Sequence, residues 1–314
     1  MGWTGPGRRR AAGLLIGFVA DAALGDPRRG HPVAGFGTVA AALERATHRD
    51  ARWAGAAHVA LLVGGTVALG RLVGRGGTAA TALATWVVLG GTSLAREGAA
   101  LAAEVEAGDL AAARRRIPSL CGRDPASLDG PGMARAGTES LAENTSDAVV
   151  APLFWGAVAG VPGLLGYRAV NTLDAMIGHR SPRYARFGWA AARLDDAANL
   201  VPARLCALLT VLLAPAVGGS PRAALAAWRR DAGAHPSPNA GPVEAAAAGA
   251  LGVTLGGRTV YAHRVEERPR LGTGPAPGPA DLRRAVRLSR LVAAASVLTA
   301  AAACAVAPVR GEEG

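Results

Sequence analysis

Lysine is absent from this 314-residue sequence, so all 34 of its Lys and Arg positions are Arg. A strong codon bias explains that preference, but the chemical consequence holds whatever its cause. Without lysine the chain cannot form a Schiff base with PLP, and it cannot supply the lysine of a phosphate-binding P-loop. A PLP-dependent enzyme and a conventional P-loop ATPase are therefore excluded.

Cysteine and aromatic residues are also scarce. Cys121, Cys206 and Cys304 are far apart and the six histidines show no HxxxH spacing, so we expect neither a disulfide framework nor a zinc site. The net charge is +11, but only three Tyr and four Phe are available to stack on bases. The arginines lie between apolar runs, which indicates membrane topology and anionic small molecules rather than nucleic acid.

Charged residues make up only 18% of the chain, against about 25% in a typical soluble domain. The apolar residues gather in five runs, at 54–69, 78–94, 149–170, 200–217 and 291–306. A helix needs about 20 apolar residues to span a bilayer. The runs predict an all-α, polytopic integral membrane protein with about five apolar helices plus amphipathic and re-entrant helices. The alternative is a soluble, Ala-rich helical bundle.

Polar blocks at 26–52, 96–147, 171–199 and 218–290 separate these runs within what we expect to be one membrane-embedded domain, 1–314. Almost no stretch alternates with the period of a strand, so no sheet is expected. Pro162 breaks the third run, which suits a re-entrant hairpin. The Gly/Pro-rich segment at about 268–280 is expected to be a flexible linker.

The N-terminus also has to be distinguished from a targeting segment. Arg8–Arg10 precede a short apolar run, as in a signal peptide, but no small-residue cleavage site follows. We expect a retained first helix. We also expect the polar blocks to meet on one face of the membrane.

The second polar block ends in an acidic stripe. Glu139, Glu143 and Asp147 are spaced i, i+4 and i+8, with Asn144 beside them. On a helix these acids share one face and repel each other. Arginines or a divalent cation would offset the repulsion, and oxygen-only ligands suit Mg²⁺. The alternative is a solvated helix face, which the adjoining apolar run disfavours.

The third block and the helix after it carry a second polar group. In order, its candidate residues are Asn171, Asp174, Arg183, Arg193, Asp195, Asp196, Asn199 and Arg204. Arg193, Asp196 and Asn199 fall on one helical face. Asp195 and Asp196 invite comparison with the DDxxD motif of terpenoid synthases, but no second acidic motif of that class follows. An ion pair within the helix, between Arg193 and Asp196, is the alternative for those two side chains.

Two loops rich in Pro and Gly complete the candidate set. "GDPRRGHPV" contains Asp26 and His31, and "HPSPNAGP" contains His235, Ser237 and Asn239. A histidine in such a loop can carry a proton or bind phosphate. The alternative is a structural hydrogen bond within the turn.

Several of these motifs together resemble the cobalamin biosynthesis protein CobD/CbiB family, the adenosylcobinamide-phosphate synthases. They are "GDPRRGHPVAGFG", "ESLAENTSDAVVAPLFW", "YRAVNTLDAMIGHRSPRYARFGWAAARLDD" and "HPSPNAG" followed by "GALGVTLGG". The resemblance covers about 21–271. Two positions depart from the family's pattern: Pro242 stands where a Trp is usual and Ala148 where a Gly is usual. The first departure affects the loop around His235.

The resemblance implies an enzyme of the cell membrane, multi-pass, with its active site on the cytoplasmic face. Such an enzyme joins the carboxylate of adenosylcobyric acid, a corrinoid substrate, to (R)-1-amino-2-propanol or its O-phosphate. Amide formation from a carboxylate needs activation, so we expect ATP and Mg²⁺ to be required. Other late cobalamin-pathway enzymes are candidate partners. A multi-pass small-molecule transporter is the alternative function, although no inverted repeat is recognisable.

The candidate residues divide into three expected roles. Catalytic roles are expected for Glu139, Glu143, Asn144, Asp174, Asp195, Asp196 and His235. Substrate or phosphate binding is expected for Asp26, His31, Asn171, Arg183, Arg193, Asn199, Arg204, Ser237 and Asn239. The candidate Mg²⁺ ligands are Glu139, Glu143, Asp147 and Asp196.

Overall fold

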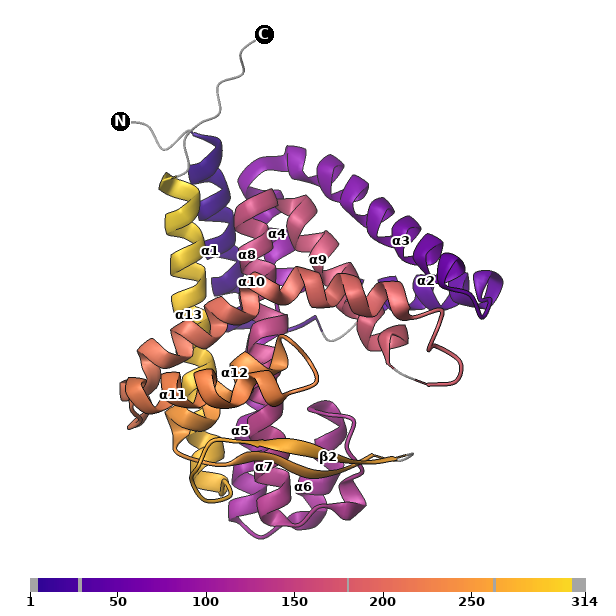
Figure 1. Ribbon diagram of the computed structural model, residues 1–314. Coiled ribbons are helices and arrows are strands. Elements are labelled where there is room, and N and C mark those ends of the chain that lie inside the picture. The colour runs from indigo at the N-terminus through magenta and orange to yellow at the C-terminus, as the bar shows by residue number, and fades with distance from the viewer. Residues whose placement is uncertain (1–4, 28–29, 180, 262–263, 307–314) are drawn as a thin grey trace. The chain divides into compact units, whose positions relative to one another are not determined.

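The computed structural model describes residues 5–27, 30–179, 181–261 and 264–306. The described chain is mostly helical (Figure 1). Its contacts divide it into two compact units. The first unit lies within Met1–Gly90, Ala151–Asn199 and Ser296–Gly314, and the second comprises Gly91–Val150 and Leu200–Ala295.

The α-helices are α1 Pro6–Leu24, α2 Pro32–Thr47, α3 Arg52–Val73, α4 Gly77–Val88, α5 Gly91–Glu106, α6 Leu110–Arg116, α7 Gly130–Thr145, α8 Ala151–Ala159, α9 Val161–Leu173, α10 Trp189–Leu213, α11 Pro221–Asp231, α12 Ala240–Leu251 and α13 Pro279–Val306. Short 3₁₀ turns are η1 Gly74–Gly76, η2 Ile117–Ser119, η3 Pro125–Ser127, η6 Ala214–Val217 and η7 Ala232–Ala234. Two π-helical turns, η4 Ser146–Val150 and η5 Asp174–Gly178, follow α7 and α9 directly.

The first unit is built on close helix pairs, in which α1 packs on α4, α3 on α9 and α8 on α9. Small residues allow these approaches: a Cβ at Gly13 would meet Thr81, and one at Gly17 would meet Thr85. Small residues at helix contacts are typical of membrane helices, because packing rather than the hydrophobic effect holds them together. A separate apolar cluster around Phe187, which is fully buried, anchors the segment before α10.

The predicted break at Pro162 is confirmed. Helix α8 ends at Ala159, Gly160 adopts a φ of 66°, and α9 begins at Val161 with Pro162 in its first turn. Glycine supplies the positive φ, and a first-turn proline loses no helical hydrogen bond. The apolar run 149–170 is therefore divided between two helices.

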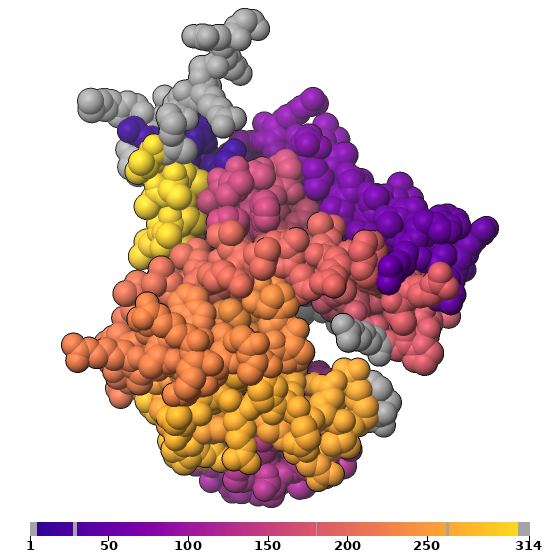
Figure 2. All heavy atoms as spheres, viewed as in Figure 1, coloured from indigo at the N-terminus to yellow at the C-terminus, as the bar shows by residue number. Residues whose placement is uncertain are grey.

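Three segments of the described chain are long and apolar enough to cross a membrane: Arg52–Glu106, Trp189–Val217 and Pro279–Val306. They contain four of the five predicted apolar runs, and the predicted count of about five apolar helices is not confirmed. Only 22% of the most apolar window of Arg52–Glu106 is buried by the protein. Figure 2 shows part of this segment, the violet α3, at the surface of its unit. So much uncovered apolar surface favours contact with lipid.

The second unit contains a β-hairpin, which the sequence analysis did not predict. Strands β1 (Leu255–Tyr261) and β2 (Arg264–Leu271) pair antiparallel, with a register shift between Leu255 and Gly257. The expectation of a purely helical chain is therefore wrong at this point. The hairpin lacks a regular apolar face because β2 is largely charged. The segment predicted to be a flexible linker, at about 268–280, begins inside β2.

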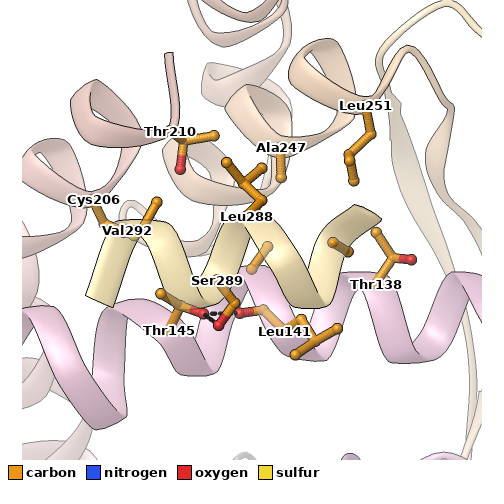
Figure 3. A pocket seen from close by; sticks show the side chains of 12 residues that line it. Thr138, Leu141, Thr145, Cys206, Thr210, Ala247, Leu251, Leu288, Ser289 and Val292 are labelled. Carbon is orange, nitrogen blue, oxygen red and sulfur yellow. Dashed lines mark hydrogen bonds between the residues drawn. The ribbon is translucent and has the colours of Figure 1, made fainter. Parts of the chain in front are cut away.

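A small cavity of about 20 Å³ lies in the interior of the second unit. Figure 3 shows Thr145 of α7 and Ser289 of α13 meeting beside it, with their hydroxyl oxygens 2.5 Å apart. Thr210 and Cys206 close it on the other side. A space of this size holds about one water molecule, so it is a packing feature and not a substrate site.

Candidate active site

Helix α7 supplies the first carboxylate of the candidate site, that of Glu139. Glu139 is buried, and its Oε2 forms a close ion pair with the buried guanidinium of Arg123. Its Oε1 accepts a hydrogen bond of 2.7 Å from the backbone N–H of Gly256, at the start of the hairpin. A β-bridge between Arg123 and Tyr261 holds the arginine against the same hairpin. Both oxygens of Glu139 are thus engaged.

Helix α12 supplies another carboxyl group, that of Glu244. Its side chain is 1% exposed, and Nε2 of His235 and Nη1 of Arg268 each lie 3.7 Å from its Oε1. These separations are too long for hydrogen bonds. Within the described part of the chain, Glu244 Oε1, His235 Nε2 and Arg268 Nε have no hydrogen-bond partner. Buried polar atoms of this kind are costly, so three of them on neighbouring side chains indicate a place for a ligand.

We name this group the buried charge cluster. It consists of four buried residues, Arg123, Glu139, His235 and Glu244, and two partly buried ones, Glu143 and Arg268.

Burial controls the protonation of the cluster. It raises the pKa of Glu244 well above its usual range, and the negative charges of Glu139 and Glu143 raise that pKa further. Burial also raises the pKa of Glu143, although the charge of Arg268 opposes the change. For His235, burial lowers the pKa and the charge of Arg268 lowers it further. Both shifts favour the neutral forms of Glu244 and His235, which lie 3.7 Å apart beside Arg268.

The loop before α12 fixes the histidine ring. The backbone N–H of Ser237 lies 3.0 Å from Nδ1 of His235 and the carbonyl oxygen of Ser237 lies 3.3 Å from it, so the loop holds this side of the ring. Ser237 Oγ accepts a hydrogen bond from the backbone N–H of Ala240 at 3.1 Å, which caps α12. Arg204 donates to Oδ1 of Asn239 at 3.2 Å. Pro242 lies in the first turn of α12, where its ring is tolerated.

The first unit holds a separate polar network. Tyr167 donates to Oδ1 of Asn199 at 2.8 Å, and Asn199 donates to Oδ2 of Asp195 at 3.0 Å. Asn171 donates to Oδ1 of Asp195 at 3.4 Å. The structure thus brings together three predicted site residues, Asn171, Asp195 and Asn199. Their predicted part in catalysis or substrate binding stays a prediction.

Other predicted residues have local partners. Arg193 and Asp196 form an exposed ion pair at 3.9 Å, so the alternative of an ion pair within α10 is confirmed. The guanidinium of Arg183 donates to Oε1 of Glu44 at 2.8 Å. Nδ1 of His31 accepts from the backbone N–H of Val33 and caps α2.

Asp26 lies half-buried in the loop after α1, and Asn144 donates to the carbonyl oxygen of Ser140 at 2.9 Å. For these residues too, a role in binding or catalysis stays a prediction.

The two π-helical turns carry two of the predicted acids, Asp147 in η4 and Asp174 in η5. Helix α7 ends at Thr145 and Asp147 lies in the π turn that follows, so the regular α-helical spacing assumed for the acidic stripe stops before its last acid. Single π turns are often found at functional sites. The position of Asp147 and Asp174 in these turns does not by itself show what either carboxylate binds.

The described residues do not form a preassembled cation site, since no group of three or more His, Cys, Asp or Glu side chains is close enough to hold a metal ion. Glu139 is fully engaged by Arg123 and Gly256. The Mg²⁺ ligands predicted from the sequence therefore gain no support from this arrangement, and the metal stays a prediction.

Three members of the buried charge cluster were missed by the sequence analysis: Arg123, Glu244 and Arg268. Glu244 stands alone in an Ala-rich run, so no acidic partner at helical spacing marked it. A lone carboxylate in such a run is itself a signal, because an ionisable group in an apolar setting is expensive. Arg268 lies at the start of the segment that was predicted to be a linker.

The chain is similar to known proteins over most of its length. A family model described as CobD/Cbib protein matches residues 14–289. The "Cobalamin biosynthesis protein CobD" of Mycobacterium tuberculosis is 63% identical over 296 residues, covering 93% of this chain and 95% of that protein. The protein of the same name from Rhodobacter capsulatus is 46% identical over 303 residues, covering 92% and 95%. A third, from Rhizobium meliloti, is 41% identical over 318 residues, covering 94% and 97%.

No solved structure matches the chain. The family match nevertheless extends over α7, the hairpin and α12, which together carry most of the buried charge cluster. The chain belongs to the CobD/Cbib family of cobalamin biosynthesis proteins.

Proposed function

We propose that this chain forms the amide bond between the carboxylate side chain of adenosylcobyric acid and (R)-1-amino-2-propanol or its O-phosphate. The product is adenosylcobinamide or its phosphate. Family membership supports a place in cobalamin biosynthesis. The observation that carries the reaction itself is the buried charge cluster, whose unpartnered polar atoms converge beside Glu244.

In this proposal the cluster stabilises negative charge on the acyl group. A protonated Glu244, the Nε2–H of His235 and the guanidinium of Arg268 can all donate to one oxygen. Donors aimed at a developing oxyanion are typically the largest single contribution to catalysis of acyl transfer. A carboxylic acid held neutral by its apolar site is a suitable donor of this kind.

The amine needs a base, because it arrives as an ammonium ion. Glu143 is our candidate: burial raises its pKa, which brings the basicity of its carboxylate closer to that of the amine. Arg123 and Glu139 hold α7 and the hairpin together, so they act as positioning residues in this proposal.

ATP activates the carboxylate in this proposal. The carboxylate oxygen takes the terminal phosphoryl group, ADP leaves, and the amine nitrogen then displaces phosphate from the acyl carbon. Mg²⁺ would arrive on the nucleotide phosphates, which is how proteins usually hold it, and no step is assigned here to a metal held by the chain alone.

The test is product formation by purified protein supplied with adenosylcobyric acid, aminopropanol O-phosphate and Mg-ATP. We expect Glu244→Gln and Arg268→Gln each to lower turnover by at least about 10²-fold, the usual cost of losing one oxyanion donor. Glu267→Gln, an exposed neighbour in β2, is the matched control and should retain turnover. Substrate passage across vesicles without product formation would favour a transporter and overturn the proposal.

We also propose that the site faces the cytoplasm of a cell-membrane protein, because its substrates are cytoplasmic metabolites. Ala126 and Ala234 are exposed in the unit that carries the cluster, so cysteines placed there are accessible to a membrane-impermeant maleimide. We expect the introduced cysteines to be labelled in inside-out vesicles and not in intact cells. The unsubstituted chain is the control, because it shows how much label its own three cysteines take up. Labelling of intact cells would reverse the orientation.

A further inference from the structure

A basic cavity of about 490 Å³ lies in the first unit, outside the sites discussed so far. It lies where three elements meet: the start of α1, the end of α3 with η1, and the turn between α8 and α9. Four arginines line it, namely Arg9, Arg10, Arg71 and Arg75. Of the described residues that line it, none is acidic.

No described residue neutralises the charges of this basic cavity. Arg9, Arg71 and Arg75 are exposed, and no carboxylate of the described chain lies within ion-pair distance of them. Some arginines elsewhere are paired: Arg116, for example, forms ion pairs with both Glu97 and Glu104. Four like charges around one space repel each other, which a bound anion would relieve.

One arginine of the cavity is fixed in place. Nη1 of Arg10 donates to the carbonyl oxygens of Ala157 and Val158, at 2.8 and 3.3 Å. These carbonyls belong to the last turn of α8, so Arg10 also neutralises the negative end of that helix. A guanidinium held in this way is preorganised for a ligand and loses little freedom on binding.

Glycine keeps the surroundings of these arginines open. Gly160, beside Arg10, has a φ of 66°, and a Cβ there would lie 3.4 Å from Nε of Arg10. The turn after α3 reads Gly-Arg-Gly-Gly at 74–77, and even a Cβ added at Gly77 would meet no atom within 4 Å. The guanidinium groups can therefore be approached without displacing other side chains.

We infer that this cavity binds a phosphate-bearing anion through Arg9, Arg10, Arg71 and Arg75. Guanidinium groups bind phosphate oxygens in pairs, with short charge-assisted hydrogen bonds. The volume exceeds that of a single phosphate, which suits a diphosphate or the glycerophosphate headgroup of an anionic lipid. Both sources present the same chemistry to the arginines, and the experiment separates them.

The test uses the full chain, purified in detergent or placed in nanodiscs. Pyrophosphate is the soluble probe, and nanodiscs of phosphatidylglycerol or of phosphatidylcholine alone supply the lipid comparison. A ligand that binds only the folded state raises the melting temperature. Arg71→Gln with Arg75→Gln removes two exposed arginines of the cavity, and Arg222→Gln with Arg229→Gln removes the same charge from exposed positions on α11.

We expect one probe to stabilise both the unsubstituted chain and the double variant on α11, Arg222→Gln with Arg229→Gln. Binding of that probe to the double variant in the cavity, Arg71→Gln with Arg75→Gln, should be weaker by at least about tenfold for each lost arginine. Stabilisation by pyrophosphate identifies a soluble phosphate ligand, and stabilisation by phosphatidylglycerol alone identifies a lipid headgroup. The inference is overturned if neither probe stabilises the unsubstituted chain. It is also overturned if the two double variants respond alike.

Discussion

At the scale of single residues, protonation of Glu244 links the site to stability. Burial raises the pKa of Glu244 well above its usual range, so the folded chain holds this proton at pH values where the unfolded chain has lost it. The free energy of unfolding therefore falls as pH rises from the unfolded value towards the raised one, by about 1.4 kcal/mol for each pH unit of that window. Glutamine, which is always neutral, does not incur this cost.

We predict that Glu244→Gln is more stable than the unsubstituted chain at about pH 8, and that the difference shrinks towards about pH 5. The measurement is the melting temperature of both proteins across that range. The pKa of His235 is lowered by burial, so its contribution is lost as pH falls, but it acts on both proteins and largely cancels. A constant difference at all pH values would mean that Glu244 is ionised in the folded chain.

The pair of Arg123 and Glu139 makes a second prediction at this scale. Both side chains are buried, so removing one partner leaves an uncompensated charge. We expect Arg123→Gln or Glu139→Gln to lower the free energy of unfolding by about 3–5 kcal/mol. The double variant should lose less than the sum of the two, as shown by a double-mutant cycle in denaturant.

An exposed pair provides the control for that cycle. Arg193 and Asp196 on α10 are 69% and 36% exposed, and such pairs contribute only about 0–1 kcal/mol. A similar loss from Arg193→Gln would show that the assay responds to any lost ion pair. Additive losses at Arg123 and Glu139 would show that the two charges do not depend on each other.

Residue types and helical spacing predicted some of these side chains but not their partners. Glu139, Glu143 and His235 were found because acids four residues apart, or a histidine in a Pro-rich turn, are visible in the sequence. Arg123 and Arg268 could not be found in this way, because they reach the acids from a loop and a strand that are distant in the chain. Spacing within one helix carries no information about contacts between elements.

At the scale of elements, the hairpin is the feature that sequence patterns did not predict. Pro269 and the glycines at 256, 257 and 272 resemble a linker by composition, and most side chains of β2 are polar. The pairing is specified instead by contacts from outside the hairpin. Arg135 on α7 donates to the carbonyl oxygens of Gly256 and Arg258, at 2.6 and 2.8 Å.

Two adjacent glycines of β1 allow a matched test of this hairpin. Gly256 and Gly257 have φ values of 82° and 81°, so alanine costs about 1–2 kcal/mol at either position. A Cβ at Gly256 would also collide with the carbonyl oxygen of Pro269, whereas one at Gly257 meets only the flexible end of Arg135. We predict that Gly256→Ala lowers stability and turnover more than Gly257→Ala does.

The readouts are the melting temperature and product formation of the two variants side by side. Because the N–H of Gly256 donates to Glu139, displacement of β1 should reach the buried charge cluster directly. Equal effects from both substitutions would show that the close contact with Pro269 does not constrain the hairpin.

At the scale of the whole molecule, apolar runs predicted the membrane-spanning character better than the number of spans. The run 149–170 was long enough to count as a span, yet Gly160 and Pro162 divide it between α8 and α9. The runs 54–69 and 78–94 fall in one long apolar segment, in which the turn η1 joins α3 to α4 and a short break at 89–90 separates α4 from α5. Hydropathy averages over such turns, so it recognises apolar surface more reliably than helix ends.

The distinction between a membrane protein and a soluble Ala-rich bundle can be tested at Leu61. This side chain is 61% exposed, and it lies near the middle of α3, Arg52–Val73. In a bilayer, Leu61→Asp would place a carboxylate near the hydrocarbon centre, at a cost of about 2.5–3.5 kcal/mol on insertion scales. In a soluble protein the same substitution would change stability by less than about 0.5 kcal/mol.

We therefore predict that Leu61→Asp lowers the amount of protein recovered in the membrane fraction, while Leu61→Ala, which stays apolar, is recovered almost normally. The measurement is the ratio of membrane-bound to total protein at matched expression. Only 22% of the most apolar window of this segment is buried by the protein itself, so this apolar surface is available for contact with lipid. Normal recovery of Leu61→Asp, in a soluble form, would show instead that α3 faces water.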